Sequence, residues 1–172
     1  MCGIVGISAE SNVASEIYES LLMLQHRGQD AAGMVVCDDE GRLNSRKSMG
    51  YVRDVFQQRH MEKLIGSYGV GHVRYPTAGG AGKEFAQPMY VNSPYGISLA
   101  HNGNLTNAIE IREKMVKEGS IFQTTSDTET IVQLIAKSKR LKTIDKIIDA
   151  IFQIHGGYAI TMLTSKKLIG IR

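Results

Sequence analysis

The sequence contains only two cysteines and no long hydrophobic run, and each absence excludes a class of protein. Two cysteines, Cys2 and Cys37, are too few for a disulfide framework or for an iron–sulfur cluster with four cysteine ligands. No stretch approaches the ~20 apolar residues of a membrane-spanning helix, and Glu10 interrupts the apolar N-terminus too early for a signal peptide. We therefore expect a cytoplasmic protein with reduced thiols and no membrane partner.

Charge of neither sign dominates the chain. Twenty Lys and Arg residues against seventeen Asp and Glu residues leave a formal net charge of +3, which is too small to indicate a nucleic-acid partner. The five histidines are scattered, without the cysteine or carboxylate spacing of a metal site, so no metal is expected. The glycine-rich segment 77–84 has Thr77 and Glu84 where a phosphate-binding loop needs Gly and Ser or Thr, and we reject that interpretation.

With 172 residues, of which 42% are apolar, the chain is expected to form one globular domain. Apolar periodicity predicts helices from 13 to about 25, within 52–64, after 106, from 126, and over 144–154. It predicts strands near 5–7, 32–37, 68–72, 95–100, 158–163 and 168–171, with a polar strand after a turn at 38–41. The segment from 75 to about 88 is expected to be a long irregular loop, and such loops tend to be functional. This order indicates mixed α and β structure with substantial antiparallel pairing.

Cys2 is the first candidate for chemistry. Removal of Met1 would make Cys2 the N-terminal residue, and its thiol would then lie beside a free α-amino group. Such an amine has a pKa of about 7.7–8.0, which suits a general base, so nucleophile and base would belong to one residue. Gly3 lets the backbone turn tightly around a bound substrate. The alternative is a buried and inert cysteine.

Other segments carry side chains that suit acyl transfer. The amide of Asn102 and the N–H of Gly103 would make a two-donor oxyanion hole, although Asn-Gly is also a common turn signal. Arg74, at the end of a predicted strand, suits a substrate carboxylate because guanidinium pairs with it through two N–H groups; the alternative is a surface arginine. Asp127 follows the Ser126 cap and either binds a substrate ammonium or only complements the helix dipole.

Together these segments resemble the glutamine amidotransferases that use an N-terminal cysteine, and among them the amidophosphoribosyltransferases. The resemblance is carried, in the expected order, by MCGIVG at 1–6, HRGQDAAG at 26–33, GHVRYPTAG at 71–79, AHNGNLTN at 100–107 and SDTE at 126–129. Gln87-Pro88 and the segment 91–96 are similar to the amidophosphoribosyltransferases in particular. The similarity runs from residue 1 to about 135 and is weaker beyond, where the segment 156–159 still fits.

The resemblance implies an α+β fold, the N-terminal-nucleophile hydrolase sandwich of two mainly antiparallel sheets between helix layers. It implies Cys2 as the nucleophile, with Asn102 and the N–H of Gly103 as the oxyanion hole. The implied reaction is hydrolysis of glutamine to glutamate and ammonia through a γ-glutamyl thioester.

The resemblance also implies how glutamine is bound. Arg74 and Asp127 would hold its α-carboxylate and its α-ammonium group. Arg27 is expected to line the site near Cys2, and Thr77 to lie in a loop that closes over glutamine. In the full enzyme, the ammonia would be transferred to phosphoribosyl diphosphate to make 5-phosphoribosylamine, the first committed step of de novo purine synthesis.

We expect residues 1–172 to be the glutaminase domain, truncated near its C-terminal end, because 168–172 read as a strand without a polar tail. We expect these residues to lack the phosphoribosyltransferase domain, for which Mg²⁺ is expected, whereas no cofactor is expected here. The full-length form is expected to be a homo-oligomer.

Two alternative functions remain at this point. One is the glutaminase domain of a hexosamine-forming amidotransferase. The motifs of such domains resemble His-Arg-Gly-Tyr-Asp-Ser and Arg-Trp, and this chain differs from them at Gln29, Ala31 and Tyr75. The other is a non-catalytic amino-acid-binding module, for which loss of Cys2 or retention of Met1 would be typical.

Overall fold

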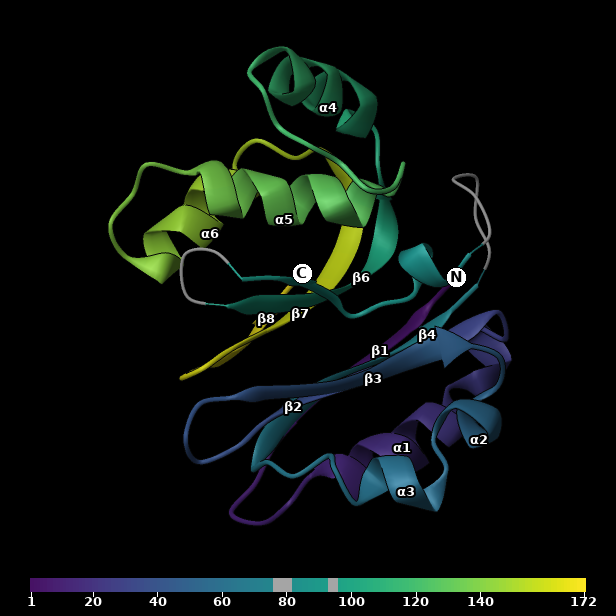
Figure 1. The fold of residues 1–172 in the computed structure, drawn as a ribbon. Coiled ribbons are helices and arrows are strands. Elements are labelled where there is room, and N and C mark those ends of the chain that lie inside the picture. Colours follow the sequence, from purple (N-terminus) through teal and green to yellow (C-terminus); the bar gives the residue numbers. More distant parts are fainter. Residues whose placement is uncertain (76–81, 93–95) are drawn as a thin grey trace.

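The computed structural model describes residues 1–75, 82–92 and 96–172, in which two β-sheets lie face to face between helices (Figure 1). Sheet A has the order β1-β4-β2-β3 and contains β1 (Gly3–Ser8), β2 (Ala31–Cys37), β3 (Leu43–Met49) and β4 (Tyr68–Arg74). Sheet B has the order β5-β6-β7-β8 and contains β5 (Met89–Val91), β6 (Ile97–Leu105), β7 (Gly156–Thr164) and β8 (Leu168–Ile171). All paired strands are antiparallel.

Helices cover the outer face of each sheet (Figure 1). On sheet A lie α1 (Ala14–Met23), α2 (Val52–Val55) and α3 (Gln58–Met61). On the side of sheet B, α5 (Asp127–Lys137) packs on the sheet, while α4 (Ala108–Lys117) and α6 (Thr143–Ile151) pack against α5. The expected α+β sandwich of two antiparallel sheets between helix layers is therefore confirmed.

Separate apolar cores hold each helix layer on its sheet. Between α1 and sheet A, the buried side chains include Ile17, Leu21, Met34 and Val73. Between α5, α6 and sheet B, they include Leu99, Ile131, Ile135 and Met162. Each such side chain contributes about 1.5–3 kcal/mol on burial. A smaller cluster joins the two sheets and consists of Val35, Cys37, Val70 and Leu163.

Side chains alternate between the two faces of each strand, and this alternation builds the space between the sheets. On β4, an added Cβ on Gly71 would lie 2.7 Å from a side chain of α1, so the next residue, His72, faces sheet B. On β6, Leu99 packs in the core under α5, so His101 also faces α5 and Asn102 faces sheet A. The side chain of His72 therefore points from sheet A toward sheet B, and that of Asn102 points from sheet B toward sheet A.

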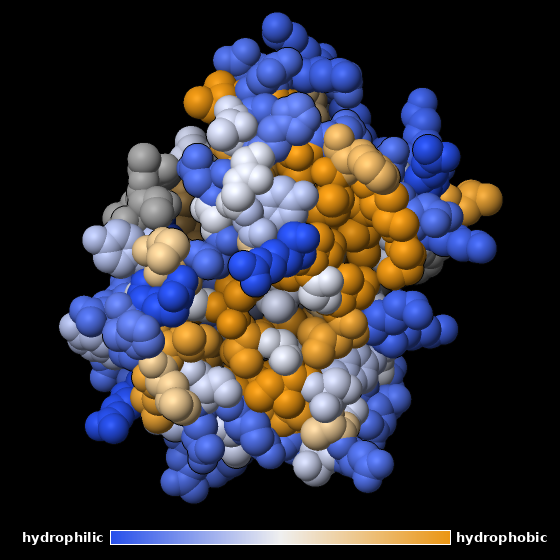
Figure 2. Space-filling model, turned by 180° about the vertical axis from the view of Figure 1, so that it is seen from behind, coloured by the Kyte–Doolittle hydropathy of each residue, from blue (hydrophilic) through white to orange (hydrophobic). Residues whose placement is uncertain are grey.

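The back of the molecule carries an apolar surface across its middle (Figure 2). β1 and β8 are edge strands of their sheets and contact each other. The apolar side chains of β8 are half-buried, as are Val5 and Ile7 on β1. The sandwich is thus less completely covered at this edge than over its helix-bearing faces.

One sequence-based boundary along β6 is wrong, and a neighbouring strand was not predicted. The strand expected to end at 100 continues to Leu105, so the segment 101–104 is strand rather than turn. Pairing with β7 along the whole of β6 outweighs the turn preference of Asn102-Gly103. The short strand β5, which the sequence pattern did not predict, follows the expected loop and pairs with 97–99.

Two helix predictions are also wrong in their extent. The helix expected within 52–64 is two helices, because Phe56 leaves the helical conformation with φ −109° and ψ 84°. Gln57 then starts α3 through a reciprocal capping interaction with His60. The helix expected to reach Ile154 ends at Ile151, although Ile154 remains buried in the same core.

Gly71→Ala tests the close contact between β4 and α1. The added Cβ would lie 2.7 Å from Ile17 and 2.9 Å from Val5, so we expect the free energy of unfolding to fall by about 1–3 kcal/mol. Gly170→Ala on β8 is the matched control, because nothing lies within 4 Å of its added Cβ, and it should be neutral or slightly stabilising. Urea unfolding followed by circular dichroism measures both; equal effects would contradict the contact.

Candidate active site

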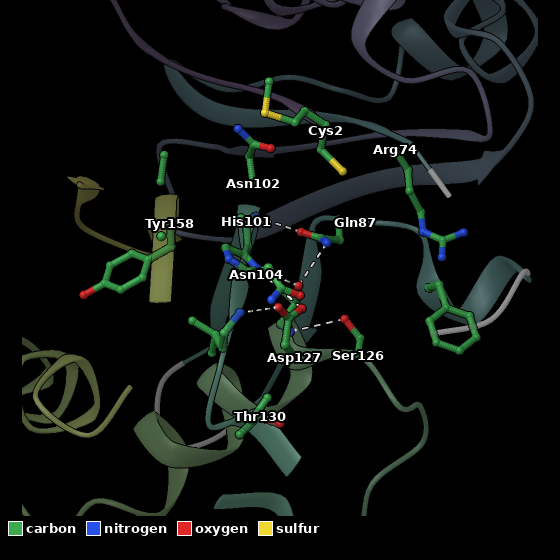
Figure 3. A pocket seen from close by; sticks show the side chains of 18 of the residues that line it. Cys2, Arg74, Gln87, His101, Asn102, Asn104, Ser126, Asp127, Thr130 and Tyr158 are labelled. Carbon is green, nitrogen blue, oxygen red and sulfur yellow. Dashed lines mark hydrogen bonds and ion pairs between the residues drawn. The ribbon is translucent and has the colours of Figure 1, made fainter. Parts of the chain in front are cut away.

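A cavity of about 1370 Å³ opens beside the N-terminus, between the ends of the two sheets (Figure 3). Its lining brings together five candidate residues that are far apart in the sequence: Cys2, Arg74, Asn102, Gly103 and Asp127. Of the other two candidates, Thr77 lies outside the described residues, and Arg27 is not among the lining residues. The sequence therefore predicted correctly which distant segments meet.

Cys2 immediately precedes β1, and its thiol points into the cavity (Figure 3). Its Sγ lies 4.0 Å from the carbonyl oxygen of Tyr75. The Nε–H of Arg27 donates to the carbonyl oxygen of Cys2 at 3.0 Å. Arg27 therefore holds the main chain of the candidate nucleophile, next to the site but outside the described cavity lining.

Arg74 ends β4 and is only 5% exposed. Its guanidinium forms an ion pair with Asp30 and lies over the ring of Phe85, 5.2 Å from the ring centre. Gly28 allows this arrangement, because an added Cβ there would lie 2.5 Å from the main chain of Arg74. The Asp30 N–H donates to the Arg74 carbonyl at 3.0 Å. A guanidinium held in this way keeps a fixed orientation toward the cavity, as binding of a carboxylate requires.

β6 extends beyond β5. Along this edge, main-chain groups of its last residues form hydrogen bonds with side chains instead of with a neighbouring strand. The N–H of His101 donates to Gln87 Oε1 at 2.7 Å, and the N–H of Leu105 donates to Asp127 Oδ2 at 3.1 Å. Since the N–H groups of alternate strand residues point to the same edge, the N–H of Gly103 also points to this edge. Gly103 lines the cavity, so its N–H has the direction that an oxyanion donor needs.

The side chain of Asn102 lies near Cys2, on the face of β6 opposite to His101 (Figure 3). The next position has no room for a side chain, because a Cβ on Gly103 would overlap the carbonyl oxygen of Gly157 on β7. A side-chain amide and a main-chain N–H from two successive residues are therefore available on the Cys2 side of the cavity.

Asp127 is the first residue of α5, and the hydroxyl of Ser126 caps the helix by accepting from the N–H of Thr128 at 3.2 Å. Asp127 Oδ1 lies 3.6 Å from His101 Nδ1, which is itself 3.1 Å from Thr128 Oγ1. Burial raises the pKa of Asp127, but the His101 ring and the N–H groups of Leu105 and Thr128 lower it more. The pKa is therefore below its usual value, and the charged carboxylate suits a substrate ammonium.

His72 is fully buried between the sheets, behind the cavity. Burial lowers the pKa of its ring to about 3, so the ring is neutral at neutral pH. Its Nε2 lies 3.3 Å from the carbonyl oxygen of His101 and donates to it, because a carbonyl only accepts. The other ring nitrogen, Nδ1, has no hydrogen-bond partner in the part of the chain that the structure describes.

Sequence reasoning assigned no role to three polar residues of this region: Asp30, Gln87 and His72. Gln87 is only 6% exposed, and its Nε2–H donates to Thr128 Oγ1 at 3.0 Å while its Oε1 accepts from His101. The available signal was a polar residue beside apolar ones, which requires a partner if it is buried. That signal does not identify the partner, because each partner comes from a distant segment.

Other features of the described residues offer no second site. Cys37 is buried, and its burial raises the pKa of the thiol, which keeps it in the unreactive form. Within residues 1–75, 82–92 and 96–172, no three His, Cys, Asp or Glu side chains gather as metal ligands. No helix of the described chain has the length and apolar character to cross a membrane.

Comparison with known proteins gives a consistent result. Residues 80–172 match the family described as "Glutamine amidotransferase domain". Over its whole length the chain is 51% identical to the amidophosphoribosyltransferase of Pseudomonas aeruginosa. Over 98% of its length it is 40% identical to the amidophosphoribosyltransferase of Bacillus subtilis. It covers 36% of each of these relatives. The chain thus spans about a third of the length of the curated relatives that it matches.

Solved structures agree with these relatives. A structure described as the allosteric regulatory enzyme of purine biosynthesis covers 99% of this chain with a TM-score of 0.92 and 38% identity. The glutamine phosphoribosylpyrophosphate amidotransferase of B. subtilis, complexed with ADP and GMP, covers 99% with a TM-score of 0.90 and 36% identity. This chain covers 37% and 36% of those two chains.

The buried ring of His72 predicts a pH dependence of stability. Between the ordinary pKa near 6.5 and the folded value of about 3, the unfolded state binds a proton that the folded state does not. The free energy of unfolding should therefore fall as the pH drops below about 6.5, by about 1.4 kcal/mol per pH unit from this residue, until the pH reaches the folded pKa.

His72→Gln keeps an N–H donor and does not titrate, so it should lose less stability on acidification than the wild type. Between pH 7 and pH 5 the difference should be roughly 2 kcal/mol. Urea unfolding of both proteins at the two pH values measures it. Parallel losses in the two proteins would show that the ring is not buried in its neutral form.

Proposed function

The chain belongs to the glutamine amidotransferase domain family, and from this membership and the cavity we propose that it hydrolyses glutamine to glutamate and ammonia. One observation carries the proposal: the thiol of Cys2 and the N–H edge of β6 at Gly103 face the same cavity. A nucleophile opposite a pair of donors is the arrangement that acyl transfer needs.

The chemical step begins at Cys2 after removal of Met1. The free α-amino group takes the thiol proton, and the sulfur attacks the side-chain amide carbon of glutamine. The amide oxygen becomes an oxyanion, which the Asn102 amide and the Gly103 N–H stabilise. The protonated α-amino group then gives its proton to the departing nitrogen, so ammonia leaves and a γ-glutamyl thioester remains. Water attacks the thioester, and glutamate and the free thiol are released.

The unreactive end of glutamine is bound by two opposite charges on different elements. Arg74, fixed by Asp30, pairs with the α-carboxylate, and Asp127 at the start of α5 pairs with the α-ammonium. Arg27 positions the nucleophile by donating a hydrogen bond to the carbonyl oxygen of Cys2. The two charges select an amino acid and place its side-chain amide near the thiol.

In the whole protein, we propose, the ammonia is transferred to phosphoribosyl diphosphate. The relatives named amidophosphoribosyltransferase support this, and they are about three times as long as this chain. No segment of the sequence has the pattern of a phosphate-binding loop. We therefore propose that the transfer, with its Mg²⁺, uses residues beyond these 172, in a cytoplasmic homo-oligomer. The described residues have no ligand cluster for that ion.

Cys2→Ala should lower glutamine hydrolysis by about 10⁴-fold or more, because no other group supplies the thioester. The fold should persist, since Cys2 belongs to neither helix-covered core. A coupled assay of glutamate release measures the rate, and intact mass establishes whether Met1 has been removed. A diazo-ketone analogue of glutamine should add its mass to the peptide that starts at Cys2. Labelling at Cys37, or an unchanged rate, would remove Cys2 from the mechanism.

Substitutions of Asn102 and Asp127 should affect different kinetic constants. Asn102→Ala removes a contact that strengthens only as the oxyanion forms, so kcat should fall by about 10²–10³-fold with KM nearly unchanged. Asp127→Asn should mainly raise KM for glutamine and reduce the preference for glutamine over glutaramate, which lacks the α-amino group. Steady-state kinetics on both substrates measure this. The reverse pattern would mean that the two roles are exchanged.

A further inference from the structure

The main chain of His101 is held on both of its polar groups by side chains from other segments. Its N–H donates to Gln87 Oε1 at 2.7 Å, and its carbonyl oxygen accepts from His72 Nε2 at 3.3 Å. Both contacts lie along the edge of β6 on which β5 pairs, at a position beyond the residues 97–99 that β5 reaches. Asn102, the next residue along β6, carries the oxyanion amide of the proposed reaction.

His72 comes from the sheet that carries the nucleophile. On β4 it lies opposite Ile4 of β1, two residues beyond Cys2. It is 0% exposed and is not among the described residues that line the cavity. Its hydrogen bond therefore connects the sheet that positions Cys2 to the strand that positions Asn102.

The His72 ring makes this one hydrogen bond in the part of the chain that the structure describes. The ring is neutral, and its Nδ1 is buried without a described partner. Leaving a buried polar atom without a partner destabilises the folded state. An apolar side chain of similar size would avoid that loss. We therefore expect the imidazole to stabilise the fold little more than such an apolar side chain would.

We propose that His72 and Gln87 clamp the main chain of His101 and thereby position the Asn102 amide and the Gly103 N–H relative to Cys2. His72 acts as a positioning residue that never touches substrate. The inference rests on the proposed glutaminase function.

The clamp acts through the rigidity of the peptide group. The carbonyl that His72 binds belongs to the peptide plane that ends at the Asn102 nitrogen. Rotation of this plane would turn both oxyanion donors away from positions that must be correct to a few tenths of an ångström, because donors stabilise an oxyanion at about 2.7–3.1 Å. Gln87 restrains the preceding peptide plane through the His101 N–H, so the two contacts together fix both planes that flank the Cα of His101. Lys47 Nζ holds the carbonyls of Ala86 and Pro88 on either side of Gln87.

Three substitutions of His72 separate the hydrogen bond from the packing. The side-chain nitrogen of Gln reaches about as far as Nε2 of His, whereas that of Asn reaches only as far as Nδ1. His72→Gln should keep kcat for glutamine within threefold of the wild type. His72→Asn and His72→Leu should lower kcat roughly 10- to 100-fold with KM changed less than threefold. Gln87→Met, which removes the contact with the His101 N–H, should lower kcat in the same range.

Alkylation of Cys2 by iodoacetamide is the control, because that displacement forms no oxyanion. Its rate should be the same in all variants and the wild type, and thermal unfolding shows which variants are folded. A fall in kcat that His72→Gln does not rescue would overturn the proposal. So would an alkylation rate that falls in parallel with kcat, or a kcat unchanged in His72→Leu.

A spectroscopic readout does not depend on activity. Long-range ¹H–¹⁵N spectra of the wild type should show His72 as the neutral tautomer protonated at Nε2. If wild-type protein with a processed Cys2 does not hydrolyse glutamine, the proposed function fails, whereas this tautomer still reports the hydrogen bond. Protonation at Nδ1 would overturn the clamp itself, whatever the activity.

Discussion

The site depends on one constraint: the last residues of β6 have a strand on one edge only, and their polar groups on the other edge need partners. Buried main-chain N–H and C=O groups are almost always paired. Here the partners are side chains from β4, the loop before β5 and the start of α5, namely His72, Gln87 and Asp127. Between them, the N–H of Gly103 faces the cavity. A substrate oxygen would therefore occupy the place that a neighbouring strand takes elsewhere in the sheet.

Close contacts between main-chain segments bring these side chains to their places. A Cβ on Gly28 would collide with the main chain of Arg74, and a Cβ on Gly33 would overlap the carbonyl oxygen of Gln87. Asp30 lies between the two glycines, with its N–H on the Arg74 carbonyl and its carboxylate on the guanidinium. The segment 26–33 thus acts through its shape as well as its chemistry. It contacts the main chain of Arg74 through Gly28 and that of Gln87 through Gly33.

The sequence predicted those parts of the fold that local patterns determine. The apolar runs of β2 and β7 and the Ser126 cap of α5 are such patterns, and the structure contains all three. Five of the seven residues that it singled out, whose types suit one reaction, line the cavity. It did not predict that Asn102 lies inside a strand, since pairing with β7 is a distant contact. The Asp30–Arg74 pair was missed for the same reason: spacing in the sequence says nothing about which buried charges meet.

In the proposed reaction the two sheets supply different groups, since Cys2 precedes a strand of sheet A and Asn102 belongs to sheet B. The apolar contacts between the sheets are non-directional, so they resist separation more than they resist sliding. Directional contacts are needed to fix the register. The hydroxyl of Tyr68 donates to the Ser165 carbonyl at 2.7 Å near one end of β4, and His72 reaches sheet B nearer the cavity. Two such bonds along one strand restrict both translation and rotation of the sheets. Buried polar groups that cost stability in an apolar layer therefore lie where, in the proposed mechanism, the distance between Cys2 and the oxyanion donors is set.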